Sequence, residues 1–196
     1  MTVALAHGAG APMDSPFMET VATGLAENGL RVARFEFPYM AKRRKEGTKK
    51  PPDRAPVLLQ TWREVIDRLG HERLIVGGKS MGGRIASIIA ATLEQDGAPV
   101  SGVACLGYPF HPPGKPERLR TEHLEAIKTP TLILQGERDP FGRRDEVEAY
   151  RLSKAIRLHW LADGDHGFKP RKASGRTEAD NIEEAVAVLA EFADAL

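Results

Sequence analysis

Three short segments of this sequence carry residue types that could catalyse hydrolysis. The first is GKSMG at 78–82, a G-x-S-x-G pentapeptide typical of a nucleophilic serine on a sharp turn between a strand and a helix. A serine needs a histidine to take its proton and an acid to orient that histidine. The segments GERD and DGDH supply both, in the chain order Ser, acid, His. We therefore predict a catalytic triad of Ser80, Asp139 and His166.

The Gly-Lys-Ser at 78–80 also resembles the end of a phosphate-binding P-loop. That loop needs the pattern G-x-x-x-x-G-K-[ST], so that glycine-rich backbone can curl around a phosphate. The residue five positions before Gly78 is Arg73, and the intervening residues include the apolar run Leu74 to Val76. A buried strand cannot also be a phosphate-cradling loop. We therefore reject the P-loop interpretation and expect no stabilisation by ATP or GTP.

Two other carboxylates compete with Asp139 for the role of the acid. Glu137 lies closer to the end of its strand, and Asp165 directly precedes His166. An acid next to its histidine in sequence points poorly toward Nδ1, which favours Asp139. Structural roles are the alternative: Asp139 could open a helix at Pro140, and His166 could be an inert loop residue.

The tetrahedral intermediate of acyl transfer needs N–H donors for its oxyanion. A serine on such a turn places the N–H of Met81 near that oxygen. The segment HGAGA at 7–11 follows the first predicted strand and resembles the HG-type loop that supplies a second donor in esterases. We predict Ala9 as that donor, and we expect His7 to brace the loop rather than to transfer protons.

Side chains that follow the carboxyl ends of strands are the candidates for a substrate pocket, because ligands bind there in open α/β sheets. Ordinary packing is the alternative role for each of them. The two tyrosines are favoured because a hydroxyl could orient the substrate. The predicted substrate-binding residues are Met13, Tyr39, Tyr108, His111 and Phe168.

Short apolar runs alternate with helix-period segments along the chain. Strands are expected at 2–7, 31–37, 73–78, 100–107, 129–136 and 157–162. Helices are expected from Pro16 to the stop signal at Asn28-Gly29, and at 56–69, 81–94 and 178–195. Near-continuous apolar strands separated by helices predict an α/β fold with a parallel sheet covered on both faces. We expect one domain over 1–196.

Composition and charge are those of an ordinary globular protein. The 196 residues are 41% hydrophobic and 28% charged, with a net charge of +1. This balance gives no overall attraction to nucleic acid or to anionic membranes, and we expect neither as a partner. Cys105, the only cysteine, lies in an apolar stretch and is expected to be a buried packing thiol. The first residues show no basic leader and no apolar run of signal-peptide length, so we expect a cytoplasmic protein.

The segment 42–50 carries the one charge run of the sequence, with six basic residues in nine. It could steer acidic substrates or nucleic acid toward a site near Tyr39. A solvated loop is the favoured interpretation, because no aromatic residues are interleaved with the charges and no nucleic-acid-binding fold is recognisable.

Together, HGAG, GKSMG, GERD and DGDHGF resemble the α/β-hydrolase superfamily over nearly the whole chain. The longer stretches HGAGAPMDSPFM, FEFPYM, GGKSMGGR and LGYPFHPPGKPERLRTEHL are similar to small bacterial hydrolases grouped with testis-expressed protein thirty and with a hydrolase-like subunit of the non-specific-lethal complex. The resemblance implies a mostly parallel six-stranded sheet with strand order 2-1-3-4-5-6. Compared with larger relatives, we expect this chain to lack the two leading antiparallel strands and a helical cap domain.

These observations predict a cofactor-free serine hydrolase that cleaves a small carboxylic ester or thioester through an acyl-enzyme, without a metal. Amide cleavage is less favoured because a poor leaving group also needs a well-placed proton. A non-catalytic interaction module that keeps the fold is the alternative. Fold alone does not fix the substrate, and the oligomeric state stays open.

Overall fold

Six parallel strands form the sheet in a computed structural model that describes residues 1–196. Their order is β2-β1-β3-β4-β5-β6, which confirms the predicted α/β class and topology. The expected strand ends are within one or two residues of the observed ones. The strands are β1 (Thr2–Ala6), β2 (Arg31–Phe35), β3 (Leu74–Lys79), β4 (Gly102–Leu106), β5 (Thr131–Gly136) and β6 (Ile156–Leu161). Because β3 runs through Lys79, the Gly-Lys-Ser segment is strand and turn, as the rejection of a P-loop requires.

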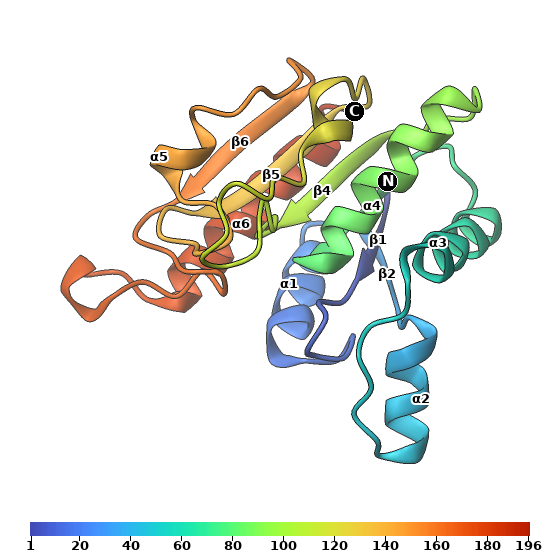
Figure 1. Ribbon diagram of the computed structural model, residues 1–196, viewed down its shortest axis with the longest axis horizontal. Helices are drawn as coiled ribbons and strands as arrows, with labels where there is room; N and C mark the ends of the chain where they lie inside the picture. The colour runs from blue at the N-terminus through green and yellow to red at the C-terminus, as the bar shows by residue number, and fades with distance from the viewer.

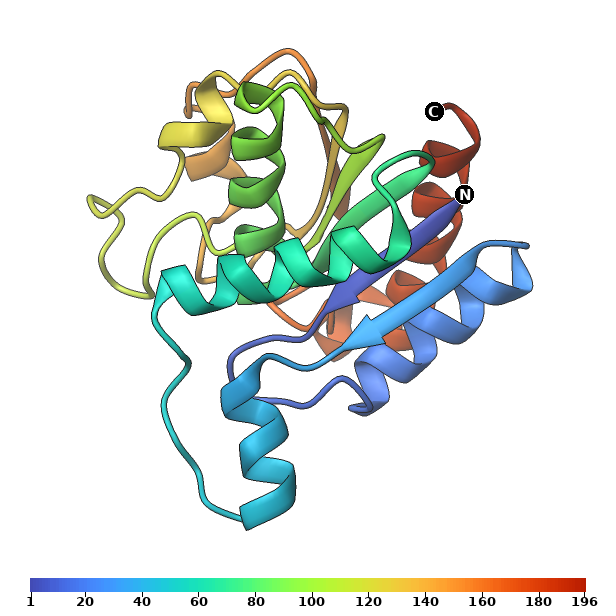
Figure 2. The ribbon, with the colours of Figure 1, turned by 90° about the vertical axis from the view of Figure 1, so that its right-hand side faces the viewer.

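Four long helices cover the two faces of the sheet, two on each face (Figures 1 and 2). The helices are α1 (Pro16–Glu27) and α6 (Glu178–Asp194) on one face, and α3 (Ala55–Leu69) and α4 (Met81–Gln95) on the other. Each face has its own hydrophobic core. Trp62 and Ile85 lie in the core beneath α3 and α4, and Leu25 and Leu189 lie in the core beneath α1 and α6. The apolar residues at helical spacing thus point where the pattern predicts.

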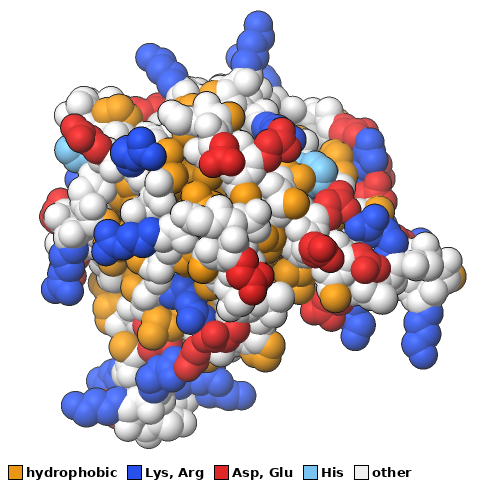
Figure 3. Space-filling view, turned by 180° about the vertical axis from the view of Figure 1, so that it is seen from behind, with side chains coloured by type: hydrophobic (Ala, Val, Ile, Leu, Met, Phe, Trp, Pro, Cys, Tyr) orange, Lys and Arg blue, Asp and Glu red, His pale blue; other side chains and the backbone are white.

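The segment after β2 departs most from the sequence-based expectation. Helix α2 (Pro38–Glu46) occupies part of the basic run that we expected to be a solvated loop. It begins with proline at its first position and ends at Gly47, whose φ is 72°. Its first turn is anchored by the buried side chains of Tyr39 and Met40, while its last turn carries the basic residues. Figure 3 shows Lys and Arg side chains gathered at this projecting end of the molecule.

The remaining regular elements are short. They are α5 (Arg144–Val147) and two 3-10 helices, η1 (Glu122–Glu125) and η2 (Lys172–Ser174). Only η1 interrupts the connection between β4 and β5, so no cap domain covers the carboxyl ends of the strands. None of the helices combines the length and the apolar character that crossing a membrane requires.

Asn181 fastens helix α6 to the loop that follows β6. Its side chain is fully buried, and Nδ2 donates hydrogen bonds to the carbonyl oxygens of Ala162 (3.1 Å) and Phe168 (2.7 Å). Its Oδ1 accepts a hydrogen bond from Arg176 Nε at 2.9 Å. All three polar contacts of this buried amide hold the loop that carries His166.

Replacing Asn181 with alanine should lower the free energy of unfolding by about 3 kcal/mol, because two buried carbonyls lose their donor. Urea unfolding followed by circular dichroism measures this loss. Asn28→Ala is the matched control: its exposed amide donates to Gly24 O at 2.8 Å, so we expect a loss of less than about 1 kcal/mol. Equal losses in the two variants would contradict the fastening role of Asn181.

Candidate active site

Ser80 occupies a strained turn between β3 and α4. Its φ and ψ are 52° and −114°, in a region that residues with a side chain rarely adopt. The turn is possible because helix and strand approach closely at glycines. A Cβ at Gly78 or at Gly82 would lie 2.2 or 2.4 Å from the carbonyl oxygen of Ala6. The Ser80 N–H donates to Leu106 O at 3.0 Å and fixes the turn to the end of β4.

His166 and Asp139 meet at the same edge of the sheet, after β6 and β5. The His166 Nδ1–H donates to Asp139 Oδ2 at 2.7 Å, and the Asp139 side chain is fully buried. Two further donors hold the carboxylate: Gln135 Nε2 at 3.1 Å from Oδ2 and the Phe141 N–H at 2.9 Å from Oδ1. This arrangement leaves Nε2 of the imidazole free to accept a proton.

The two rival carboxylates are committed elsewhere. Glu137 accepts hydrogen bonds from the Asp163 N–H and from Arg144, each at 2.9 Å, and these donors lower the pKa of Glu137. Asp165 Oδ1 accepts from the backbone N–H groups of Gly167 (2.7 Å) and Lys169, and so shapes the histidine loop. Of the three acids, Asp139 alone contacts the His166 ring.

Ser80 and His166 line one cavity of about 470 Å³. Phe141 also lines it, and its ring lies against the imidazole with the ring centroids 4.3 Å apart. The Ser80 hydroxyl makes no hydrogen bond to the imidazole in this structure. Such contacts are often long in a free enzyme and tighten when substrate binds.

The loop after β1 forms another wall of the cavity, and Ala9 is exposed there. His7 braces this loop: its Nδ1–H donates to Gly8 O at 2.7 Å, and its Nε2 accepts from the Phe37 N–H at 3.2 Å. Burial lowers the pKa of His7, so the ring is neutral, as both contacts require. Met81 does not line the cavity; it directly follows Ser80 and opens α4, where the first N–H groups of a helix lack partners within it.

A strained serine turn, a histidine–aspartate pair and a cavity thus meet at one edge of the sheet. A family model for the alpha/beta hydrolase domain matches residues 1–194. This chain belongs to the α/β-hydrolase family. The family relationship supports a general hydrolase function.

Solved structures show the same fold at low sequence identity. An α/β-superfamily hydrolase of Xanthomonas campestris is 20% identical with a TM-score of 0.68, covering 100% of this chain and 99% of that one. A dienelactone hydrolase from Anabaena variabilis is 22% identical with a TM-score of 0.69, covering 97% and 84%. A serine hydrolase homologue from Coxiella burnetii is 21% identical with a TM-score of 0.67, covering 96% and 85%.

The two tyrosines predicted to bind substrate do not line the cavity of this α/β-hydrolase. The Tyr39 side chain is buried, and its hydroxyl donates to Ala9 O at 3.0 Å. Tyr39 therefore supports the loop after β1 from behind. Tyr108 is fully buried, and its hydroxyl donates to Arg120 O at 2.8 Å. Both hydroxyls are used by backbone carbonyls, which sequence spacing does not reveal.

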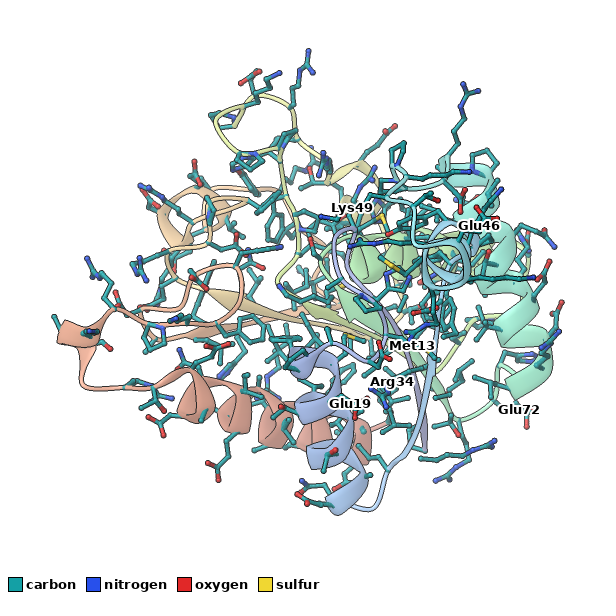
Figure 4. The ribbon with its side chains drawn as sticks, turned by 90° about the horizontal axis from the view of Figure 1, so that it is seen from below. Met13, Glu19, Arg34, Glu46, Lys49 and Glu72 are labelled. Carbon is teal, nitrogen blue, oxygen red and sulfur yellow. The ribbon has the colours of Figure 1, made fainter.

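The other three predicted substrate-binding residues also lie outside the cavity wall. His111 is buried with Nδ1 at 2.9 Å from Pro112 O, and Phe168 is fully buried in the core beneath α1 and α6. Met13 lies beside Arg34, which donates to the Met13 carbonyl at 2.9 Å (Figure 4). The structure instead brings Phe17 and Phe141 to the cavity.

Lys79 is the main residue of the site that sequence reasoning missed. Its Nζ donates to the carbonyl oxygen of His166 and lies 5.2 and 5.4 Å from the ring centroids of Phe17 and Phe168. Burial lowers the pKa of Lys79 to about 8, partly opposed by the charges of Asp139 and Asp165. The lysine thereby ties the serine turn to the histidine loop. The only signal in the sequence was that Lys79 directly precedes Ser80. That Gly-Lys-Ser pattern suggested a phosphate-binding loop and gave no indication of a contact with the histidine loop.

The lowered pKa of Lys79 predicts a pH-dependent stability. Between about pH 8 and its ordinary value of 10.5, the unfolded chain binds a proton that the folded chain does not, so stability rises with pH. Relative to Lys79→Met, the wild type should therefore gain about 2 kcal/mol of unfolding free energy between pH 7 and pH 10. Urea unfolding at the two pH values measures the difference. Relative to the variant Lys154→Met, which removes an exposed lysine, the wild type should show no such gain. If the stability difference between the wild type and Lys79→Met is the same at both pH values, the buried ammonium is refuted.

Proposed function

We propose that this α/β-hydrolase is a serine hydrolase with Ser80 as nucleophile, His166 as base and Asp139 as the acid that orients it. The observation that carries the proposal is the 2.7 Å contact between His166 Nδ1 and the fully buried carboxylate of Asp139, beside a cavity that His166 and the strained Ser80 both line. A histidine held by a buried carboxylate beside a serine on such a turn is the arrangement that activates a hydroxyl.

In the proposed reaction, His166 Nε2 takes the proton of Ser80 Oγ, which attacks the acyl carbonyl. The N–H groups of Ala9 and Met81 stabilise the oxyanion. The imidazolium then protonates the leaving group, and an acyl-enzyme remains. A water molecule, deprotonated by the same imidazole, releases the acid and restores Ser80. Lys79 takes no part in these proton transfers; its contact with the His166 carbonyl keeps the imidazole in place.

The proposed substrate is a small carboxylic ester or thioester. The cavity is about 470 Å³ and no cap domain encloses it, so a large acyl chain would remain in contact with water. Phe17 and Phe141 offer an apolar surface large enough for a short chain. The reaction needs no cofactor, because the serine, histidine and carboxylate supply the nucleophile and the proton transfers.

Ser80→Ala should lower kcat for p-nitrophenyl butyrate by about 10⁴-fold or more, and Asp139→Asn by about 10⁴-fold, because the serine is lost or its base is misoriented. The exposed control Asp145→Asn should retain activity. A fluorophosphonate should label the wild type, since Ser80 Oγ displaces fluoride from phosphorus, and should not label Ser80→Ala. Turnover that survives in Ser80→Ala would remove Ser80 as nucleophile. A wild type with neither turnover nor labelling would instead favour a non-catalytic interaction module.

The acyl-chain preference tests the open cavity. If the chain were fully buried, each added methylene would raise kcat/KM about fourfold, from about 0.8 kcal/mol of transfer free energy. We expect kcat/KM for p-nitrophenyl esters to peak at acetate to butyrate and to stop rising before octanoate. A steady rise through octanoate would show an enclosed acyl site and would contradict the proposed preference for small substrates.

A further inference from the structure

A second hollow lies on the outer flank of helix α4. It is a groove of about 570 Å³ between α4 and the segment 119–127, which Figure 2 shows beside the helix. It shares no lining residue with the cavity that contains Ser80. The groove is therefore a separate feature, one that the proposed hydrolysis does not use.

One end of the groove is basic and lacks counter-ions. Arg84 and Arg120 both line it, and neither guanidinium forms an ion pair or a hydrogen bond within the chain. The Nε–H of Arg84 is buried without any acceptor. Native proteins rarely leave a buried donor unpaired, particularly a charged one, because its desolvation is then uncompensated. An unpaired guanidinium in a hollow points to a missing acceptor.

The electrostatics of this end agree with that interpretation. Burial and the charge of Arg84 lower the pKa of Arg120, so the two cations repel one another. The same two causes lower the pKa of His123 to about 4, which keeps its ring neutral. The His123 Nε2–H donates to Ser87 Oγ at 2.8 Å, and the Ser87 hydroxyl donates to Arg84 O at 2.8 Å. The polar groups around the arginines are therefore fixed, while the guanidiniums are free to bind.

Two carboxylates also line the groove, but neither neutralises the arginines. Glu94 accepts hydrogen bonds from the backbone N–H groups of Lys128 and Thr129. It lies ten residues from Arg84 along α4, about 15 Å away by the helical rise. Glu122 is exposed and forms no ion pair. The charge at the basic end thus remains uncompensated.

The wall beyond the arginines is apolar. Ile88 and Ala91 from α4 face Leu119 and Ile127 across the groove. Leu119 is 49% exposed, which makes it one of the few large hydrophobic side chains that the fold leaves uncovered. A ligand that fits this surface has an anionic head and a short apolar body.

We propose that this groove binds an organic phosphate monoester, with the phosphate between Arg84 and Arg120 and the apolar body against Ile88 and Leu119. A phosphate monoester carries a charge of about −1.5 to −2 at pH 7, which matches two guanidiniums. A carboxylate would neutralise only one of them. Guanidinium groups also bind phosphate oxygens through paired N–H donors, which would satisfy the buried Arg84 Nε–H.

Isothermal titration calorimetry with three probes tests this site: hexyl phosphate, inorganic phosphate and hexanoate. Hexyl phosphate should bind the wild type most tightly, because it alone supplies both the doubly charged head and the apolar body. Arg84→Gln and Arg120→Gln should each weaken its Kd roughly tenfold or more, since each removes charged hydrogen bonds. Thermal unfolding without ligand should show that both variants are folded, because removing either cation relieves repulsion.

Two further variants locate the bound phosphate. Arg118→Gln removes the same charge from an exposed neighbour that does not line the groove, and it should keep the wild-type Kd within about twofold. Ser80→Ala should also keep it, because the groove is separate from the catalytic cavity. Absence of hexyl phosphate binding, or unchanged binding in both arginine variants, would overturn the site. Loss of hexyl phosphate binding in Ser80→Ala would show that the ligand binds in the catalytic cavity. Hexanoate that binds as tightly as hexyl phosphate would refute a preference for the phosphate group.

Discussion

The close approach of helix α4 to strand β3 and its neighbour β1 is the constraint on which the rest of the site depends. A methyl group at Gly82 would lie 2.4 Å from Ala6 O and 2.7 Å from His7 O, so only glycine allows the helix to start there. This contact forces Ser80 into its left-handed conformation and lifts its side chain out of the backbone. It also places the start of α4 against the end of β1 and the residue that follows it. The proposed nucleophile and the proposed oxyanion donor at Met81 thus depend on one packing contact.

The histidine loop also packs closely against a glycine, since a Cβ at Gly136 would lie 2.4 Å from the carbonyl oxygen of Asp165. Polar side chains hold the loop in addition. Asn181 grips it through Ala162 and Phe168, and Lys79 donates to the carbonyl oxygen of His166 itself. Asp139 then sets the rotation of the ring through Nδ1. These are buried or partly buried hydrogen bonds, so each is strong in its low-dielectric surroundings and expensive to break. The serine turn is thus positioned by close packing at glycines, and the histidine loop by close packing together with a polar network.

The sequence predicted most of the fold because the strands and long helices are strongly periodic. Helix α2 was missed, since its basic residues dominate the segment and only Tyr39 and Met40 anchor it. Asp139 could be preferred to Asp165 from the sequence, because an acid directly next to its histidine is poorly placed to reach Nδ1 of that histidine. The places of Tyr39 and Tyr108 could not be predicted, because their partners are backbone carbonyls distant in sequence, at Ala9 and Arg120. Periodicity reveals which face is buried, and it does not reveal which buried hydroxyl finds which acceptor.

The short connection between β4 and β5 explains both hollows of the molecule. Helix α4 buries Ile85 and Ile89 against the sheet, and the residues one position earlier, at 84 and 88, are turned about 100° away and form a partly exposed stripe. With only η1 in that connection, no long helix covers this stripe, and a groove remains between it and residues 119–127. The same connection leaves the carboxyl ends of the strands without a cap, so the cavity at Ser80 stays open. The short connection thus leaves two separate hollows open, the cavity at the turn before α4, where we propose an acyl substrate, and the groove on the outer flank of α4, where we propose a phosphate.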